Sequence, residues 1–174
     1  LLIFYNDEQY LSKSIESILN QTFNDFELIM FDNGSTDGSY EVAHNYAKND
    51  SRVKIIRSES NYHNGSLNVR KLLAHATGEY LRLFCADDIM LPDCLKTQID
   101  FLDNNNDYIA CFAHMKSIDD DGKPLKNNYD STKKDNRYEY LNHIFYSNQS
   151  FAFPTAMVRK EMLKPEMLDP RLIH

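Results

Sequence analysis

The sequence is poor in the residues that mark several common protein classes. It has no tryptophan and only five glycines and three cysteines among 174 residues. Neither GxGxxG nor GxxxxGK[ST] occurs, which excludes the usual glycine-rich phosphate-binding loops. No apolar run reaches the ~18 residues that a membrane-spanning helix needs, and no signal peptide is recognisable. A phosphorylated ligand would therefore need another form of charge compensation.

Positive charge is also scarce. The chain has 19 Lys and Arg against 26 Asp and Glu, which gives a formal net charge of −7. Nucleic acids and anionic membranes are bound through basic surfaces, so we expect no nucleic-acid partner and no transmembrane segment in this chain. The hydrophobic fraction of 42% is enough for one globular domain with a sizeable core.

The cysteines and histidines show no metal-site spacing. Cys85, Cys94 and Cys111 are widely and irregularly spaced, and no CxxC, HxH or HExxH occurs. We interpret the cysteines as reduced, mostly buried thiols of a cytosolic protein, with a metal or redox role as the alternative.

The first hundred residues repeat one pattern of strand and helix. Apolar runs at 1–5, 27–31, 53–57 and 80–84 start 26, 26 and 27 residues apart, which is the length of a strand, a helix and two loops. Apolar residues at helical spacing follow the first run: Leu11, Ile15, Ile18 and Leu19. The pattern predicts an open, mostly parallel α/β sheet, Rossmann-like and flanked by helices.

Two helix starts are suggested by local signals. Asn6 and Gln9 have the spacing of a capping pair for the first helix. Pro92 suits the first turn of a later helix, with Asp93 near its positive end. That helix would carry Leu95, Ile99 and Leu102.

The pattern changes beyond about residue 105. Residues 108–118 suggest one or two strands, and 119–122 a hairpin turn that fails the calcium-loop pattern because Lys123 follows the glycine. Residues 127–153 are rich in aromatics, which would form core or, alternatively, pack on sugar rings.

Polar clusters follow each of the four apolar runs. They are "YND" (5–7), "DNGSTDGS" (32–39), "SESNYHNG" (58–65) and "CADD" (85–88). Ligands of open parallel sheets bind beyond the carboxyl ends of the strands, so these clusters should converge on one site. Asp87 and Asp88 would repel each other unless a cation lies between them, and Mn²⁺ or Mg²⁺ suits hard oxygen ligands and phosphates. The alternative is that Asp87 caps a helix and Asp88 is solvated.

The motifs, taken in order, resemble a known family. "FYNDEQYLSKSIESILNQTFNDFELIMFDNGSTDGS" (4–39) and "NGSLNVRKLLAHATGEYLRLFCADDIMLPDCL" (64–95) are similar to the inverting family-2 glycosyltransferases, and "PTAMVRKEML" (154–163) looks like a later segment of them. The resemblance implies the GT-A nucleotide-diphospho-sugar fold. It also implies metal-assisted transfer of a sugar, with inversion, from a nucleotide-diphosphate sugar to an acceptor hydroxyl.

Site residues carry over position by position from this resemblance. It implies that the nucleotide is bound by Tyr5, Asn6, Asp32, Asn33, Arg70, Lys71, Ala86 and Asp87. For Arg70 and Lys71, a solvated helix face is the alternative. The metal would be held by Asp87 with Asp88, because Cys85 replaces the first Asp of the family's DxD triplet. Asn33 replaces an Asp of the base-binding turn, which leaves the base preference open.

The resemblance also sets expectations for the whole protein. A UDP-sugar is the favoured donor, with GDP- and TDP-sugars as alternatives, and the acceptor would be a glycan or lipid-linked. The setting would be polysaccharide or glycan assembly in the cytoplasm, at the inner face of a membrane. Residues 1–104 would form the donor-binding half and 105–174 the start of the acceptor half of one structural domain.

We expect the chain to be truncated at both ends, with the catalytic base beyond His174. Two other functions remain open at this point. One is a non-catalytic nucleotide-sugar or glycan-binding module. The other is a nucleotidyltransferase, which is disfavoured because "YNDEQY" lacks its basic, glycine-rich loop.

Overall fold

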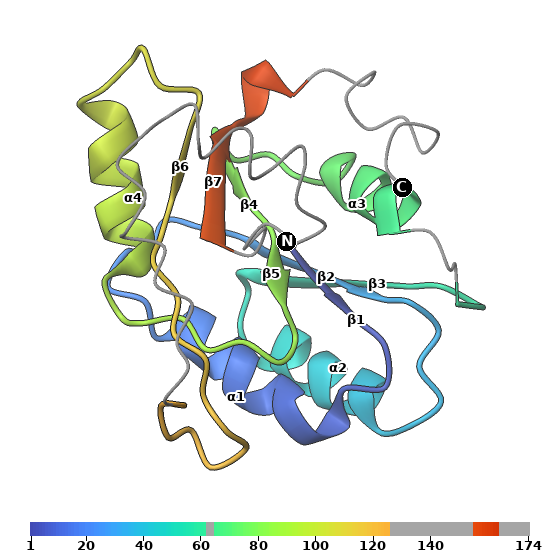
Figure 1. Ribbon diagram of the computed structural model, residues 1–174. Helices are drawn as coiled ribbons and strands as arrows, with labels where there is room; N and C mark the ends of the chain where they lie inside the picture. Colours follow the sequence, from blue (N-terminus) through green and yellow to red (C-terminus); the bar gives the residue numbers. More distant parts are fainter. Residues whose placement is uncertain (62–64, 126–154, 164–174) are drawn as a thin grey trace, which may run out of the picture.

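The computed structural model describes residues 1–61, 65–125 and 155–163 (Figure 1). Its main sheet contains β1 (Leu2–Phe4), β2 (Leu28–Asp32), β3 (Val53–Arg57) and β5 (Phe84–Cys85). The strand order is β3-β2-β1-β5, and each neighbouring pair is parallel. The predicted α/β fold with a parallel sheet is therefore confirmed.

Helices cover both faces of this sheet. In Figure 1, α1 (Glu8–Leu19) and α2 (Ser39–Asn49) lie on one face and α3 (Gly65–Leu73) on the other. All five residues of β2 are buried. Leu28 and Met30 pack in the core cluster on the α1 and α2 face, whereas Ile29 and Phe31 pack in a second cluster with Leu72 of α3. The alternation of strand side chains thus explains why β2 is continuously apolar.

The fourth apolar run does not form one strand, and this part of the prediction is wrong. Residues 84–85 pair with β1, but β4 (Tyr80–Arg82) belongs to a second, antiparallel sheet of order β4-β7-β6. Its other strands are β6 (Ala110–Phe112) and β7 (Ala156–Arg159). An apolar run indicates a buried strand but does not specify its partner, and β7 lies far along the chain. The second sheet therefore takes strands from both predicted halves.

Two details of the helix starts are also wrong. Asn6 does not pair with Gln9; it has a left-handed φ of 56°, and its Oδ1 accepts a 2.8 Å hydrogen bond from the Thr36 amide. Asp7 is the N-cap residue of α1 instead. Pro92 lies just before α4 (Cys94–Asp103), whose N-cap residue is Asp93. The expected pair of Asn6 and Gln9 does not form because the loop after β2, distant in the sequence, binds the Asn6 side chain.

The later segment agrees with the sequence where it is described. β6 and the bridge between Ile118 and Pro124 give the expected strands, and the turn at 119–122 is closed by the Gly122 amide on the Asp119 carbonyl at 2.8 Å. A short 3₁₀ helix, η3 (Lys160–Met162), follows β7. The aromatic-rich stretch at 127–153 lies outside the described residues.

Candidate functional site

The polar clusters converge on one edge of the main sheet. The strands are parallel, so the segments that follow β1, β2, β3 and β5 all leave from the same edge. The chain moves outward from β1 through β2 to β3, and later places β5 on the other side of β1. The boundary between β1 and β5 is therefore the topological switch point, where ligands of open α/β sheets bind.

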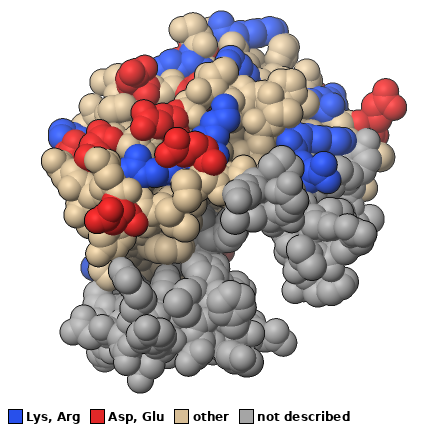
Figure 2. Space-filling view, turned by 90° about the horizontal axis from the view of Figure 1, so that it is seen from above, with Lys and Arg blue, Asp and Glu red and all other residues tan. Residues whose placement is uncertain are grey.

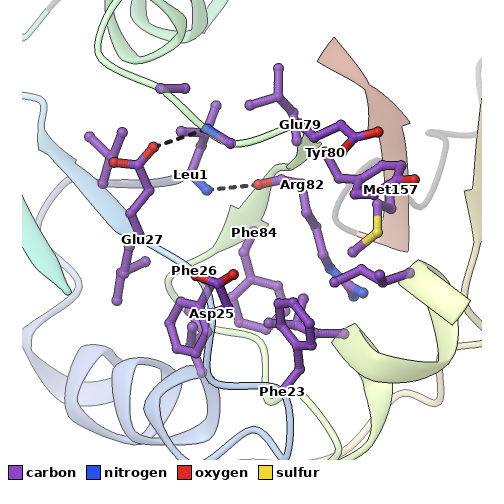
Figure 3. Close-up of a pocket in the computed structure, with 18 of the residues that line it drawn as sticks. Leu1, Phe23, Asp25, Phe26, Glu27, Glu79, Tyr80, Arg82, Phe84 and Met157 are labelled. Carbon is purple, nitrogen blue, oxygen red and sulfur yellow. Dashed lines mark hydrogen bonds between the residues drawn. The ribbon is translucent and has the colours of Figure 1, made fainter. Parts of the chain in front are cut away.

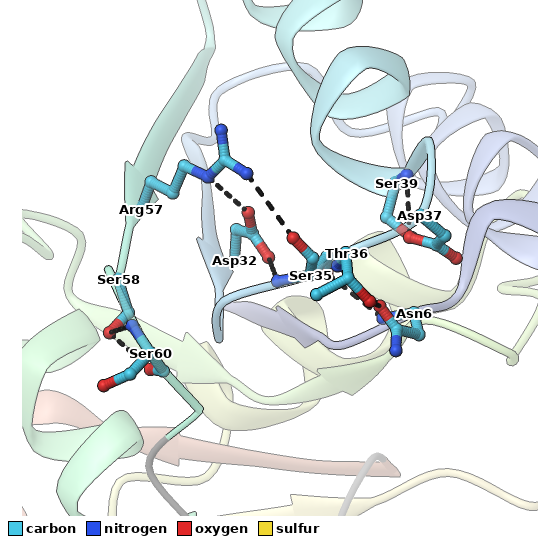
Figure 4. Close-up of polar contacts among 9 residues, drawn as sticks. All are labelled: Asn6, Asp32, Ser35, Thr36, Asp37, Ser39, Arg57, Ser58 and Ser60. Atoms are coloured by element: carbon cyan, nitrogen blue, oxygen red, sulfur yellow. Dashed lines mark hydrogen bonds and ion pairs between the residues drawn. The ribbon is translucent and has the colours of Figure 1, made fainter.

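The loop after β2 is built around Asp32, whose side chain is fully buried. Its Oδ1 accepts a 2.8 Å hydrogen bond from the Ser35 amide, and its Oδ2 lies 3.1 Å from Arg57 Nε (Figure 4). Residues 32–38, which begin with this last residue of β2, are called the β2 loop below. In this arrangement Asp32 organises the loop, and its carboxylate is not exposed to a ligand.

Asn33 and Gly34 attach the β2 loop to its neighbours. The Asn33 amide donates to the Phe4 carbonyl at 3.0 Å, and its side chain donates to Asn61 Oδ1 at 2.8 Å. Gly34 has a φ of +82°, and a Cβ there would lie 2.7 Å from the backbone carbon of Ser60. Only glycine fits this close approach.

Arg57 was not among the residues predicted from the sequence. Besides pairing with Asp32, its guanidinium lies 4.0 Å from the ring centroid of Tyr40, and its side chain is 46% exposed. It is therefore held on two sides but still reachable from solvent. Its place at the end of the run "VKIIR" (53–57), at the binding edge, was the signal that could have identified it.

Tyr5 and Asn6 lie beside this loop at the end of β1. Tyr5 is 41% exposed, as a ring that stacks on a base must be, and its amide donates to Asp7 Oδ2 at 2.9 Å. Asn6 is tied to the β2 loop through its amide, which donates to Ser35 Oγ at 3.1 Å (Figure 4). The structure thus brings together four of the predicted base-side residues, of which Tyr5 and Asn6 are exposed and Asp32 and Asn33 are buried.

A second group lies at the end of β5. Cys85, Asp87 and Asp88 each offer a ligand atom, and these atoms lie within 4.8 Å of one another. Residues 85–88 form a turn, called the cation loop below. It is closed by a hydrogen bond of 3.3 Å that the Asp88 amide donates to the Cys85 carbonyl. Cys85 is exposed, contrary to the expectation of mostly buried thiols, whereas Cys94 and Cys111 are half-buried.

Negative charge in the cation loop is only partly compensated. Partial burial, and then the neighbouring Asp87, raise the pKa of Asp88, and the charge of Arg82 opposes them without cancelling the rise. Desolvation of the thiol and the nearby carboxylates raise the pKa of Cys85 to about 11. Asp7 also has a raised pKa, from desolvation first and then from Asp87 and Asp37. Asp7 therefore belongs to the same acidic region. The sequence predicted that its cluster, "YND" (5–7), would lie at this edge, but Asp7 itself was not among the predicted site residues.

These groups suit a divalent cation. Two carboxylates provide the hard oxygen ligands that Mn²⁺ and Mg²⁺ prefer, and Cys85 adds a softer sulfur ligand. A cation at Cys85, Asp87 and Asp88 would offset the repulsion that raises the pKa values of this loop.

The remaining predicted residues lie elsewhere. The side chain of Ala86 is buried in the core cluster, so only the backbone of this residue could contact a ligand. Arg70 and Lys71 lie on α3, across the sheet from α1 and α2 (Figure 1). Arg70 is exposed, and Lys71 Nζ lies 5.6 Å from the ring centroid of Phe31. Neither is placed in the two groups described above.

A separate cavity lies at the opposite edge of the sheet. It has a volume of about 410 Å³ and is lined near the strand starts by Leu1, Phe23, Phe26, Leu28 and Phe84 (Figure 3). Its walls combine these apolar residues with charged ones, including Glu27 and Arg82, and the residues of the cation loop are not among them. We place the candidate site at the carboxyl edge because the polar clusters that follow the four parallel strands converge there.

Charged side chains of both signs lie on the described surface. Acidic and basic side chains lie interspersed over the described part of the face in Figure 2. No helix within residues 1–61, 65–125 and 155–163 has the length and apolar character to cross a membrane.

Comparison with known proteins agrees with this geometry. The family model "Glycosyl transferase family 2" matches residues 1–165. An uncharacterized glycosyltransferase of Methanocaldococcus jannaschii is 33% identical over 171 residues, which are 97% of this chain and 58% of the relative. The chain thus spans little more than half of that relative.

Solved structures share the fold. S. aureus TarS 1–349 in complex with UDP superimposes with a TM-score of 0.73 at 22% identity, over 96% of this chain and 48% of the TarS 1–349 chain. A mannosyltransferase from Pyrobaculum calidifontis, in complex with GDP-Man and Mn²⁺, has a TM-score of 0.59 at 21% identity, over 67% of this chain and 34% of its own. The parallel sheet, the matched family model and the relatives agree: the chain belongs to glycosyl transferase family 2.

Proposed function

We propose that this chain is the donor-binding part of a glycosyltransferase that moves a sugar from a nucleotide-diphosphate sugar to an acceptor hydroxyl, with inversion. The observation that carries the proposal is the clustering of Cys85, Asp87 and Asp88 at the switch point, next to the exposed ring of Tyr5. Base binding and phosphate binding then lie side by side, as a nucleoside diphosphate requires.

Each group has a defined task in this proposal. Tyr5 packs on the nucleobase, while Asp32 and Asn33 hold the β2 loop in shape beside it. Asp87 and Asp88 hold Mn²⁺ or Mg²⁺, and Cys85 contributes its sulfur. The ion, when bound, neutralises the diphosphate and stabilises it as a leaving group. Arg70 and Lys71 remain candidates for binding the phosphates, which they would contact from the side of α3.

The proposal includes a donor and a setting. A UDP-sugar is favoured, and a GDP-sugar is the alternative, because the structural neighbours were solved with UDP, UDP-GlcNAc or GDP-Man. We propose assembly of a surface polysaccharide or other glycan at the cytoplasmic face of a membrane as the setting. A non-catalytic binding module and a nucleotidyltransferase lack a specific supporting observation.

The test is thermal unfolding with UDP, GDP, CDP and TDP, each with and without Mn²⁺. Ligand at a hundredfold over its dissociation constant adds about 2.7 kcal/mol, a rise of roughly 5 to 10 °C for a domain of this size. We expect such a rise with one nucleotide, only with Mn²⁺, and its loss in Asp87→Ala. Asp100→Ala removes an exposed carboxylate from α4 and should behave as wild type. No rise with any nucleotide would contradict the proposal.

A further inference from the structure

Helix α1 carries buried polar side chains on the face that meets the cation loop. Ser14 and Gln21 are 1% and 3% exposed, although neighbouring positions of the helix, such as Ile15 and Ile18, form the apolar core. Ser14 and Ser17 have the spacing i and i+3, so they lie on one side of the helix, and Gln21 follows just after its end at Leu19. Buried polar groups need partners, and these find them in one loop.

The two serines hold the backbone at the start of the cation loop and just beyond its end. Ser14 Oγ donates to the Cys85 carbonyl at 3.1 Å, and Ser17 Oγ accepts from the Met90 amide at 2.9 Å. The residues between these two anchors include Asp87 and Asp88. Ser17 Oγ also donates to the Ser14 carbonyl at 2.7 Å, which fixes the direction of its hydroxyl.

Gln21 extends the same set of contacts beyond the loop. Its side-chain amide donates to the Leu91 carbonyl at 2.8 Å and accepts from the Leu95 amide at 3.0 Å. The chain from β5 to the start of α4 is therefore attached at successive backbone groups to α1 and to the residue just after it. These contacts fix the backbone rather than the carboxylates themselves.

We infer that Ser14 and Ser17 are positioning residues of the cation site: their hydroxyls hold the backbone of residues 85–90 so that Asp87 and Asp88 face one ion. This inference rests on the proposed function. Two like charges side by side repel each other, and within the turn itself the closing hydrogen bond is long, at 3.3 Å. The anchors on α1 oppose the separation of the two carboxylates before an ion arrives, which lowers the cost of binding it.

Helix stability alone would not require these hydroxyls. Serine is a poorer helix former than alanine, so Ser17→Ala should favour α1 itself. Ser17→Ala removes the hydrogen-bond acceptor of the Met90 amide, and Met90 is only 6% exposed. The effect should therefore appear in the cation loop and not in the helix.

The test is titration of the full chain with Mn²⁺ in the presence of UDP, with free Mn²⁺ measured by electron paramagnetic resonance. We expect Ser17→Ala and Ser14→Ala each to weaken Mn²⁺ binding by about three- to tenfold, the range for loss of one neutral hydrogen bond. Ser17→Thr keeps the hydroxyl and should restore the affinity. Ser12→Ala is the matched control, because Ser12 lies on the same helix but its hydroxyl meets Tyr46 of α2.

The outcomes separate this inference from the proposed function. If the wild type fails to bind Mn²⁺ with any nucleotide, the proposed function fails. If the wild type binds and Ser17→Ala binds equally well, the positioning role is wrong. It is also wrong if Ser12→Ala weakens binding as much, or if Ser17→Thr does not restore it. Unfolding temperatures measured without Mn²⁺ should fall by a few degrees in Ser14→Ala and Ser17→Ala, the cost of one lost hydrogen bond, and all four variants should remain folded at the temperature of the titration.

Discussion

The β2 loop and the cation loop lie at the same sheet edge but differ in how their charges are satisfied. In the β2 loop, the carboxylate of Asp32 is buried, paired with Arg57 and hydrogen-bonded by the Ser35 amide. In the cation loop, Asp87 and Asp88 lie together, and the pKa of Asp88 is raised by burial and by its neighbour. The first loop is complete without a ligand, whereas the second needs a cation to balance its charge.

The difference suggests a division of labour. A preformed β2 loop keeps Tyr5 and its surroundings ready for a base at little ordering cost. A cation loop that is unfavourable when empty gains more from binding an ion, because the ion relieves repulsion as well as forming new contacts. Changes in the first loop should therefore alter stability, and changes in the second should alter metal binding.

The largest effect should come from removing the centre of the β2 loop. Asp32→Ala leaves the Ser35 amide and Arg57 without their acceptor, so we expect a loss of about 2 to 3 kcal/mol in the free energy of unfolding. Urea denaturation measures it. Asp100→Ala, which breaks an exposed pair with Lys96, should cost less than about 1 kcal/mol. Equal losses in the two variants would contradict the role assigned to Asp32.

A glycine pair separates backbone strain from close packing. Gly34→Ala adds a methyl group 2.7 Å from the Ser60 backbone, whereas Gly122→Ala, with a similar φ of +81°, meets nothing within 4 Å. We expect a loss of about 1 kcal/mol for Gly122→Ala from strain alone, and roughly 2 kcal/mol for Gly34→Ala. Urea denaturation of both variants compares them, and a Gly34 variant no worse than the Gly122 variant would show that the β2 loop is not tightly fitted.

The cation loop should respond to its missing carboxylate. Cys85→Asp restores a full DxD triplet, and we expect it to tighten Mn²⁺ binding by about tenfold because ligand charge sets affinity. Isothermal titration calorimetry with UDP present measures the change. Cys85→Ser adds no charge and serves as the control. If Cys85→Asp binds Mn²⁺ no more tightly than Cys85→Ser, residue 85 does not contact the ion.

The smallest expected effect is a pH-dependent change without metal. Because the folded state raises the pKa of Asp88 above its ordinary value of 3.8, ionisation of this group costs stability as pH rises through the folded pKa. Asp88→Asn avoids that cost, so its unfolding temperature at pH 7 should exceed that of wild type by about 1 to 3 °C. The difference should vanish near pH 3, where wild-type Asp88 is protonated. With Mn²⁺ and UDP the order should reverse.

Much of the fold could be predicted because it depends on local patterns. The spacing of the apolar runs located β1, β2 and β3. The polar residues after these runs located the sheet edge at which Tyr5 and Asp32 lie. The division of 80–84 between two sheets was missed, since the partner of β4 is β7, more than seventy residues later. A sequence pattern identifies a buried strand but not the strand beside it.

The site was predicted less completely, for reasons of long-range contact. Asn6 looked like a helix cap, but the Thr36 amide takes its side chain. Arg57 and Asp7 were missed because their roles arise only when separate strand ends meet. Ser14 and Ser17 looked like ordinary polar positions of an amphipathic helix, and only the structure shows that they face the cation loop.

The most direct test of the central claim is to locate the ion. Crystals grown with UDP and Mn²⁺ give an anomalous diffraction signal that marks manganese without assumptions about the ligands. The account predicts one strong peak in contact with Asp87 and Asp88, beside the end of β5, with the nucleotide next to Tyr5. A bound nucleotide without manganese there, or manganese only at the exposed turn at 119–121, would contradict it.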